Sequence, residues 1–308
     1  MEHGHLKHKD NYSMKEMVFA ATIATLFAFS PQTAAQFTFT PQKNNTVGFY
    51  LGGQIWQSEA SGIFGEENTL IDFKLNKEQQ INYFFAIEHP YPLLPNVRIS
   101  STMLDSTGKF TLTQKFNFGD ETFLTDAEVD ARFNVSYVDY TFYYELFSNG
   151  FFSFDLGFTA RDFNGAATVS GVTIKENTQH EADGWHESCF NEDGELYGDC
   201  SPLSTSNSVT PTGKIKTDQI EAMLHVATNI SLPLTRLSAF AQGDFSLAND
   251  HSLYDYQLGL SYGLADSRKM DVYLTLGYRA VKVEFEDLDN LYTDLEFKGA
   301  FIGMITHF

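Results

Sequence analysis

The chain has 308 residues, a formal net charge of −20 and an aromatic content of 15%, with 29 Phe and 15 Tyr. This charge disfavours binding to nucleic acids, whose phosphate backbone is also negative. The length suits one large β domain, and the many aromatic residues favour strands over helices.

The N-terminal segment predicts an export signal. Residues 17–29 form an apolar run that a lysine precedes and small residues follow. Such a run is too short to cross the roughly 30 Å of a bilayer core as a helix, so we interpret it as a secretory signal peptide cleaved after Ala35. Residues 1–13 are interpreted as an upstream extension, with Met14 as the true first residue. The mature domain is then 36–308.

Downstream of the signal, apolar and polar residues alternate. In 152–161 the even positions are apolar and the odd ones are polar or glycine, and 254–264 and 220–232 follow the same rule with few exceptions. Alternation places one kind of side chain on each face of a strand. Repeated over about ten residues, it is typical of barrel strands between lipid and a wet interior. We expect ten strands, at 47–57, 79–88, 97–105, 129–147, 151–163, 214–232, 237–248, 252–264, 270–286 and 291–308.

The predicted fold is therefore an all-β, transmembrane, antiparallel up-and-down β-barrel of about ten strands. Short connections, such as 148–150 and 233–236, match periplasmic turns, and longer ones match extracellular loops, of which 164–213 is the longest. The chain ends on Phe308, and a terminal aromatic is the usual signal to the barrel assembly machinery. An exported soluble β-sandwich is the alternative, but ten strands that each carry a bulky apolar face suit a membrane better.

Two of the expected strands change the parity of their apolar residues. In 129–147 the apolar set moves from odd positions, ending at Tyr137, to even positions, starting at Val138. The strand 270–286 changes in the same way. A β-bulge near Tyr137 would have this effect. Alternatively, these parts of the strands project above the bilayer, where no lipid enforces the alternation.

Three segments resemble motifs of an uncharacterised family of Gram-negative outer-membrane β-barrel proteins. They are the turn Glu88–Asn96 (EHPYPLLPN), the strand segment Tyr143–Glu145 (YYE) and the C-terminal Gly303–Phe308 (GMITHF). The resemblance covers essentially the whole mature chain. It implies a barrel in the outer membrane and supplies no catalytic residue. We expect such a barrel to contact outer-membrane lipid and lipopolysaccharide. The oligomeric state is left open.

The longest predicted loop contains both cysteines, Cys189 and Cys200. In an oxidising compartment we expect them to form a disulfide, which stabilises by about 2–3 kcal/mol in the chain-entropy model. Free thiols or a thiolate metal site are the alternatives. The loop also carries eight carboxylates, a type of ligand that suits Ca²⁺. We favour a solvated acidic loop, and predict no metal or cofactor site.

Charged residues on the predicted inward faces form the candidate lumen network. In a narrow barrel such side chains fill the interior and pair with one another, which would leave little or no aqueous path. A narrow pore for small solutes or ions is the other interpretation. The network is predicted to include Glu88, Arg98, Asp155, Arg161, Glu221, Asp244 and Arg279.

These observations support three functional hypotheses. The first is a non-enzymatic envelope or surface protein, and the second is a narrow diffusion pore. The third is a hydrolase at the outer rim, which rests only on the adjacent Asp250 and His251. Neighbouring strand residues face opposite sides of a sheet, so these two would not normally form a hydrogen bond. We therefore expect no enzymatic activity.

Overall fold

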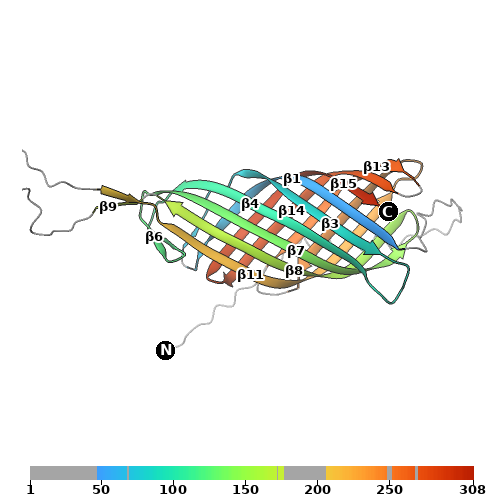
Figure 1. The fold of residues 1–308 in the computed structure, drawn as a ribbon, viewed down its shortest axis with the longest axis horizontal. Helices are drawn as coiled ribbons and strands as arrows, with labels where there is room; N and C mark the ends of the chain where they lie inside the picture. The colour runs from blue at the N-terminus through green and yellow to red at the C-terminus, as the bar shows by residue number, and fades with distance from the viewer. Residues whose placement is uncertain (1–46, 68, 172, 177–205, 248–251, 268–269) are drawn as a thin grey trace, which may run out of the picture. The chain divides into compact units, whose positions relative to one another are not determined.

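The structure, a computed structural model, describes residues 47–67, 69–171, 173–176, 206–247, 252–267 and 270–308. These residues form one closed antiparallel barrel of ten strands, as predicted (Figure 1). Each strand pairs with its neighbour along the chain, and the last strand pairs with the first from Tyr50 opposite His307 to Gly65 opposite Tyr292. Because the sheet closes, its long strands leave no unpaired edge.

All ten predicted strands are present, and several are longer than the alternation indicated. The barrel strands are β1 (Gly48–Glu66), β3 (Lys77–Glu88), β4 (Asn96–Thr111), β7 (Glu128–Ser148), β8 (Phe152–Gly171), β11 (Thr212–Ser231), β12 (Leu237–Ser246), β13 (Tyr254–Asp266), β14 (Asp271–Leu288) and β15 (Leu291–His307). A short strand, β2 (Thr69–Ile71), pairs with the end of β1. No helix in the described part of the chain is long and apolar enough to cross a membrane.

The predicted loop 164–213 is shorter than expected. Strand β8 continues to Gly171 and β11 begins at Thr212, and the two pair throughout from Phe152 opposite Ile230 to Ser170 opposite Thr212. Between them, β9 (Thr173–Glu176) and β10 (Ser206–Val209) form a separate two-stranded sheet. Cys189 and Cys200 lie outside the described residues, as do the signal segment 1–35 and Asp250 and His251.

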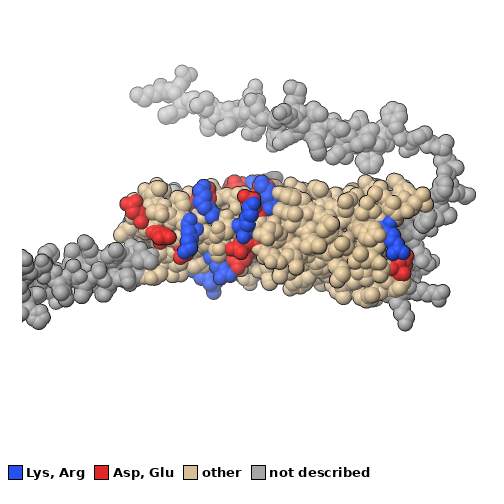
Figure 2. Space-filling view, turned by 90° about the horizontal axis from the view of Figure 1, so that it is seen from above, with Lys and Arg blue, Asp and Glu red and all other residues tan. Residues whose placement is uncertain are grey.

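The exterior of the barrel carries a broad apolar belt. Its members are exposed aromatic and aliphatic side chains from all ten strands, for example Leu51, Phe142 and Leu258, which are 49%, 44% and 52% exposed. Side chains of this size and number on an exterior face match the hydrocarbon core of a bilayer. Figure 2 shows a broad band of the visible face with no Lys, Arg, Asp or Glu. The barrel therefore spans a membrane through this belt.

Beyond the belt, the same strands continue with a charged exterior. Ion pairs bridge neighbouring strands there, for example Lys77 Nζ to Glu59 Oε2 at 2.8 Å and Lys109 Nζ to Asp130 Oδ1 at 3.1 Å. These side chains are more than half exposed, so they suit water rather than lipid. The longest connections, those between β1 and β3, β4 and β7, and β8 and β11, lie at this end, together with a two-residue turn between β14 and β15. The opposite end carries shorter turns and the C-terminus. Charged strand ends and long loops together are typical of the extracellular end of such barrels, and the two ends are named extracellular and periplasmic on that basis.

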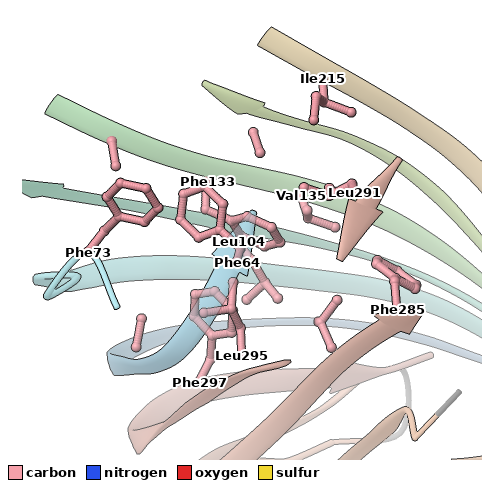
Figure 3. Packing of buried hydrophobic residues seen from close by; sticks show 14 of the residues in the cluster. Phe64, Phe73, Leu104, Phe133, Val135, Ile215, Phe285, Leu291, Leu295 and Phe297 are labelled. Atoms are coloured by element: carbon pink, nitrogen blue, oxygen red, sulfur yellow. The ribbon is translucent and has the colours of Figure 1, made fainter. Parts of the chain in front are cut away.

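Inside this projecting end, the barrel is filled by an apolar core rather than by polar residues. Figure 3 shows Phe64 from β1, Phe133 from β7, and Leu295 and Phe297 from β15 packed together. Each of the four side chains is 0% exposed. The ring centroids of Phe64 and Phe133 are 5.7 Å apart, and those of Phe133 and Phe297 are 6.1 Å apart. The prediction that charged residues face inward while Phe and Val face lipid therefore fails at this end, where Phe and Val face inward.

A small hairpin adds to this core at the extracellular end. It consists of β5 (Phe116–Phe118) and β6 (Glu121–Phe123), which contact β1 and β11. Phe116, Phe118 and Phe123 are completely buried, and the backbone N–H of Gly119 donates to Glu66 Oε1 at 2.8 Å. The hairpin thus contributes three aromatic rings to the apolar filling.

The β-bulge near Tyr137, one of the two explanations of the parity change, is absent. Pairing of β7 with β4 runs without interruption from Glu128 to Tyr143, and the register shift between β7 and β8 lies lower, between Glu145 and Phe147. Odd positions of β7 point inward on both sides of Tyr137, which is itself 1% exposed. The second interpretation of the parity change is thus confirmed for β7, because its first half lines the apolar core above the belt.

Candidate functional site

A network of buried charges lies directly below the apolar core. Its centre is Asp255 on β13, which accepts hydrogen bonds from Arg279 Nε at 2.9 Å and Nη2 at 2.6 Å, and from Arg161 Nη2 at 2.9 Å. Tyr137 donates its hydroxyl to the same carboxylate at 2.8 Å. Arg161 also forms a two-point contact with Asp139, at 2.7 and 2.9 Å. All five residues are at most 6% exposed, so this is a layer of paired charges without bulk water.

The alternation of the strands explains why these side chains meet. Asp139 and Arg161 occupy directly opposite positions on β7 and β8, and Asp255 is directly opposite Val281 on the neighbouring β14. Arg161 lies 3.8 Å from the centroid of the Tyr137 ring, and Arg279 lies 5.2 Å from that of Trp56. The guanidinium groups are therefore held by carboxylates at one edge and by aromatic faces at another.

A second buried pair faces the lower side of this layer. His225 on β11 and Asp244 on β12 are directly opposite in the register, and His225 Nδ1 lies 2.9 Å from Asp244 Oδ1. The Thr159 hydroxyl donates to the same Asp244 oxygen at 2.6 Å and shares a hydrogen bond with Thr141 at 2.9 Å. Asp244 thus orients the imidazole, and His225 also lines the cavity described next.

Below the charged layer, a cavity of about 570 Å³ occupies the periplasmic half of the barrel. Its lining includes Ser148 and Gly150 at a short turn and His307 at the C-terminus, so it lies at the end with the short connections. A smaller chamber of about 110 Å³ continues inward from it, and the two share Phe84, Arg98, Asn229 and Gln242 in their walls. A third space of about 20 Å³, enough for one water molecule, reaches the charged layer.

The structure divides the predicted lumen network into two levels. Arg161, Arg279 and Asp244 lie in or next to the buried layer, whereas Glu88 and Asp155 line the large cavity. Arg98 lies between the two levels and lines all three spaces. Glu221 is buried and directly opposite Arg161 in the register of β8 and β11, and it accepts a hydrogen bond from Gln219.

Sequence reasoning missed Tyr137 and Trp56 as partners of the charges. Tyr137 had been assigned to the apolar set that changes parity. Tyr137 faces inward together with Asp139 and Thr141. A regular alternation along β7, without a bulge, would therefore have predicted its hydroxyl beside these polar side chains. Trp56 offers no such signal, because an isolated indole in an alternating strand suits lipid or core equally well.

The three motifs of the sequence resemblance meet at the large cavity. Glu88, from the turn motif, accepts a hydrogen bond from the Tyr143 hydroxyl of the strand motif at 2.8 Å. Glu145 and His307, from the strand and C-terminal motifs, line the same space. The ring of His307 stacks on Tyr50 with centroids 4.3 Å apart. Next to it, Phe308 completes the barrel by exchanging two backbone hydrogen bonds with Phe49, at 2.9 and 3.2 Å.

The pairing of His225 with Asp244 is the part of this site that resembles a catalytic arrangement. His225 and Asp244 form the orienting half of a hydrolytic site, but no described Ser or Thr hydroxyl forms a hydrogen bond with His225. The nucleophile half is thus missing from the described residues. Those residues also contain no group of three or more His, Cys, Asp or Glu side chains with the geometry of a metal site.

No protein-family model and no curated protein sequence matches the chain. Similar folds occur among solved structures. The outer membrane protease OmpT from Escherichia coli aligns with 85% of this chain and 97% of its own, at 10% identity and a TM-score of 0.41. The transport unit of the autotransporter AIDA-I from Escherichia coli aligns with 96% of this chain and 98% of its own, at 9% identity and a TM-score of 0.36. The attachment invasion locus protein Ail of Yersinia pestis aligns with 83% of this chain and 98% of its own, at 10% identity and a TM-score of 0.29. At this level of similarity the comparison carries nothing about activity.

Proposed function

We propose that this protein is an integral outer-membrane β-barrel with a closed interior and a non-enzymatic role in the cell envelope, and that it belongs to the barrel family that its three motifs resemble. The single observation that supports a closed interior is that two layers that exclude water lie one above the other. Apolar rings fill the extracellular half, and paired charges lie directly beneath them.

Such a stack resists ion flow for two separate reasons. An ion that enters the apolar core loses its hydration shell without gaining polar partners. At the charged layer, the guanidinium and carboxylate groups that could replace water already bind one another at 2.6 to 2.9 Å. The narrow diffusion pore is therefore the weaker of the two non-enzymatic hypotheses.

Cell fractionation tests the location. The full chain is expressed in a Gram-negative host, and inner and outer membranes are separated by density. We expect the protein in the outer-membrane fraction, with the change in gel mobility on heating that folded barrels show. Recovery in the inner membrane or the soluble fraction would contradict the proposal.

Conductance in planar bilayers tests closure. Protein extracted from membranes in nonionic detergent is reconstituted beside a general diffusion porin as a positive control. We expect no discrete channels from the heat-modifiable protein under conditions in which the porin conducts. Reproducible single-channel steps from the unaltered protein would overturn the closed interior and favour the pore.

A further inference from the structure

The periplasmic cavity separates unpaired positive and negative groups along its depth. Arg98, on the inner wall, donates to Gln242 Oε1 at 2.7 Å and stacks 3.8 Å above the Phe84 ring. Among the described residues it pairs with no carboxylate. Buried or half-buried arginines normally bind an anionic group, so the inner wall offers guanidinium donors to something that the chain itself does not supply.

A second guanidinium adds to this inner end. Arg279 is 5% exposed and binds Asp255, but its Nη1 atom has no hydrogen-bond partner. Arg279 and Arg98 both line the innermost space of about 20 Å³. The carboxylates of Asp139 and Asp255 at that level are already bound to Arg161 and Arg279, and that of Asp244, which also lines this space, is bound to His225 and Thr159. Free donors at the inner end therefore favour an anionic group.

The mouth of the cavity has the opposite character. Glu145 and Asp155 occupy directly opposite positions on β7 and β8, and both line the cavity. Neither forms a hydrogen bond or ion pair with another described residue, and Glu88 nearby accepts hydrogen bonds from the Tyr143 and Tyr50 hydroxyls. Like charges directly opposite each other destabilise a sheet. A cationic group between them would relieve this repulsion.

The spacing between the two ends follows from the strand register. Arg98 is directly opposite Thr141, and Glu145 lies four residues farther along β7, which corresponds to about 13 Å at the rise of an extended strand. Glu88 lies two residues beyond Ala86, the partner of Arg98 on β3, or about 7 Å away. An extended peptide spans about 3.3–3.6 Å per residue, so two to four residues bridge these distances.

The wall between the ends suits a peptide backbone. Asn229 and Gln242 line both the large cavity and the inner chamber, and their amides provide donors and acceptors for peptide groups. In the inner chamber, the buried Gln54 Nε2 and Gln257 Oε1 have no hydrogen-bond partner. The volume of about 570 Å³ is within the usual range of small-molecule sites.

We propose that this blind cavity binds a short peptide of two to four residues from the periplasmic side, with its amino group at the acidic mouth formed by Glu88, Glu145 and Asp155 and its carboxylate at Arg98. A simple anion would meet the acidic mouth, and a simple cation would leave Arg98 unpaired. A molecule that carries both charges satisfies both ends at once. The proposal goes beyond the closed barrel and does not depend on whether the barrel conducts ions.

Isothermal titration of the folded full-length protein in nonionic detergent tests the proposal, with trialanine as the probe. We expect saturable binding of one peptide per barrel. Acetyl-trialanine, which lacks the positive charge, and trialanine amide, which lacks the negative charge, should each bind about tenfold more weakly or worse, as expected when one charge-assisted hydrogen bond is lost. No saturable binding of trialanine would overturn the proposal, and so would equal binding of the amide.

Variants assign the two ends. Arg98→Gln should weaken trialanine binding about tenfold or more while leaving the weaker affinity for trialanine amide unchanged. Glu145→Gln combined with Asp155→Asn should also lower the affinity for trialanine, but here the peptide whose affinity stays unchanged should be acetyl-trialanine. Arg98→Lys, which retains the charge, checks that any loss is not misfolding, and heat modifiability checks every variant. Lys109→Gln, on the exterior, is the matched control. Equal effects of each variant on all three peptides would contradict the assigned orientation.

Discussion

Removal of the Asp255 carboxylate should destabilise the barrel strongly, because this group neutralises two buried guanidinium groups. It accepts four hydrogen bonds, from Arg161, Arg279 and Tyr137, at 2.6 to 2.9 Å. In Asp255→Ala, Arg161 retains Asp139, but Arg279 loses its carboxylate partner among the described residues. Breaking a buried ion pair by deleting one partner costs about 3–5 kcal/mol, and we expect a loss in this range.

Urea unfolding of the protein in lipid vesicles, followed by tryptophan fluorescence, measures this loss. The control is Asp130→Ala, which removes a pair with Lys109 whose side chains are 63% and 71% exposed. Exposed pairs contribute about 0–1 kcal/mol, so the control should unfold almost like the unaltered protein. A loss below about 1 kcal/mol in Asp255→Ala would refute the claim that this layer is dry and tightly coupled.

A double variant separates the loss of pairing from the loss of packing. Arg279→Met combined with Asp255→Ala removes the charge that Asp255→Ala leaves unpaired. Replacement of both members of a buried pair is often nearly neutral, so the double variant should be more stable than Asp255→Ala alone. If the two single losses simply add, the residues act independently, and the pairing seen in the structure contributes little to stability.

Three further predictions test other parts of the molecule. Phe133→Ala should cost about 3–5 kcal/mol in the same unfolding assay, because it opens a cavity in the apolar core, whereas Phe133→Leu should cost less. Leu258→Arg, on the lipid face, should cost about 2–4 kcal/mol on insertion into vesicles, and Ser261→Arg, on the inward face of the same strand, should lack this lipid cost; equal costs would contradict the position of the belt. Cys189 and Cys200 of the exported protein should resist alkylation and react only after reduction, since we expect them to form a disulfide. Alkylation without a reductant would contradict the disulfide.

The sequence predicted the number of strands and the closed barrel because lipid imposes a simple rule. Within the belt, outward positions must be apolar, and the inward positions are polar where the barrel holds charges or water. Strand β13 obeys this rule from Tyr256 to Leu264, whose even positions are 36–52% exposed. The rule repeats on every strand, so errors in single positions do not change the result.

The sequence predicted which charged residues belong to the candidate site, but not how they are arranged. The alternation predicted that Arg161, Asp244 and Arg279 face inward, but it says nothing about how deep in the barrel each side chain lies. Depth depends on the register between strands that are distant in the chain, for example β4 and β14, which place Thr102 3.2 Å from Arg279 Nη2 across 177 residues. The separation of buried pairs at one level and unpaired groups at another is a consequence of that register.

The parity changes carry more information than the alternation itself. Within the belt the outward face is apolar, whereas above it the exterior is charged and the interior is apolar. A strand that crosses the boundary must therefore move its apolar residues to the other face, even though its backbone continues without a bulge. In β14 the change falls between Tyr278, 42% exposed, and Val281, completely buried. Pairing of β14 with β15 is continuous across these residues. Each such change marks the height at which that strand leaves the lipid, so the outer boundary of the membrane can be located from the sequence of a projecting barrel.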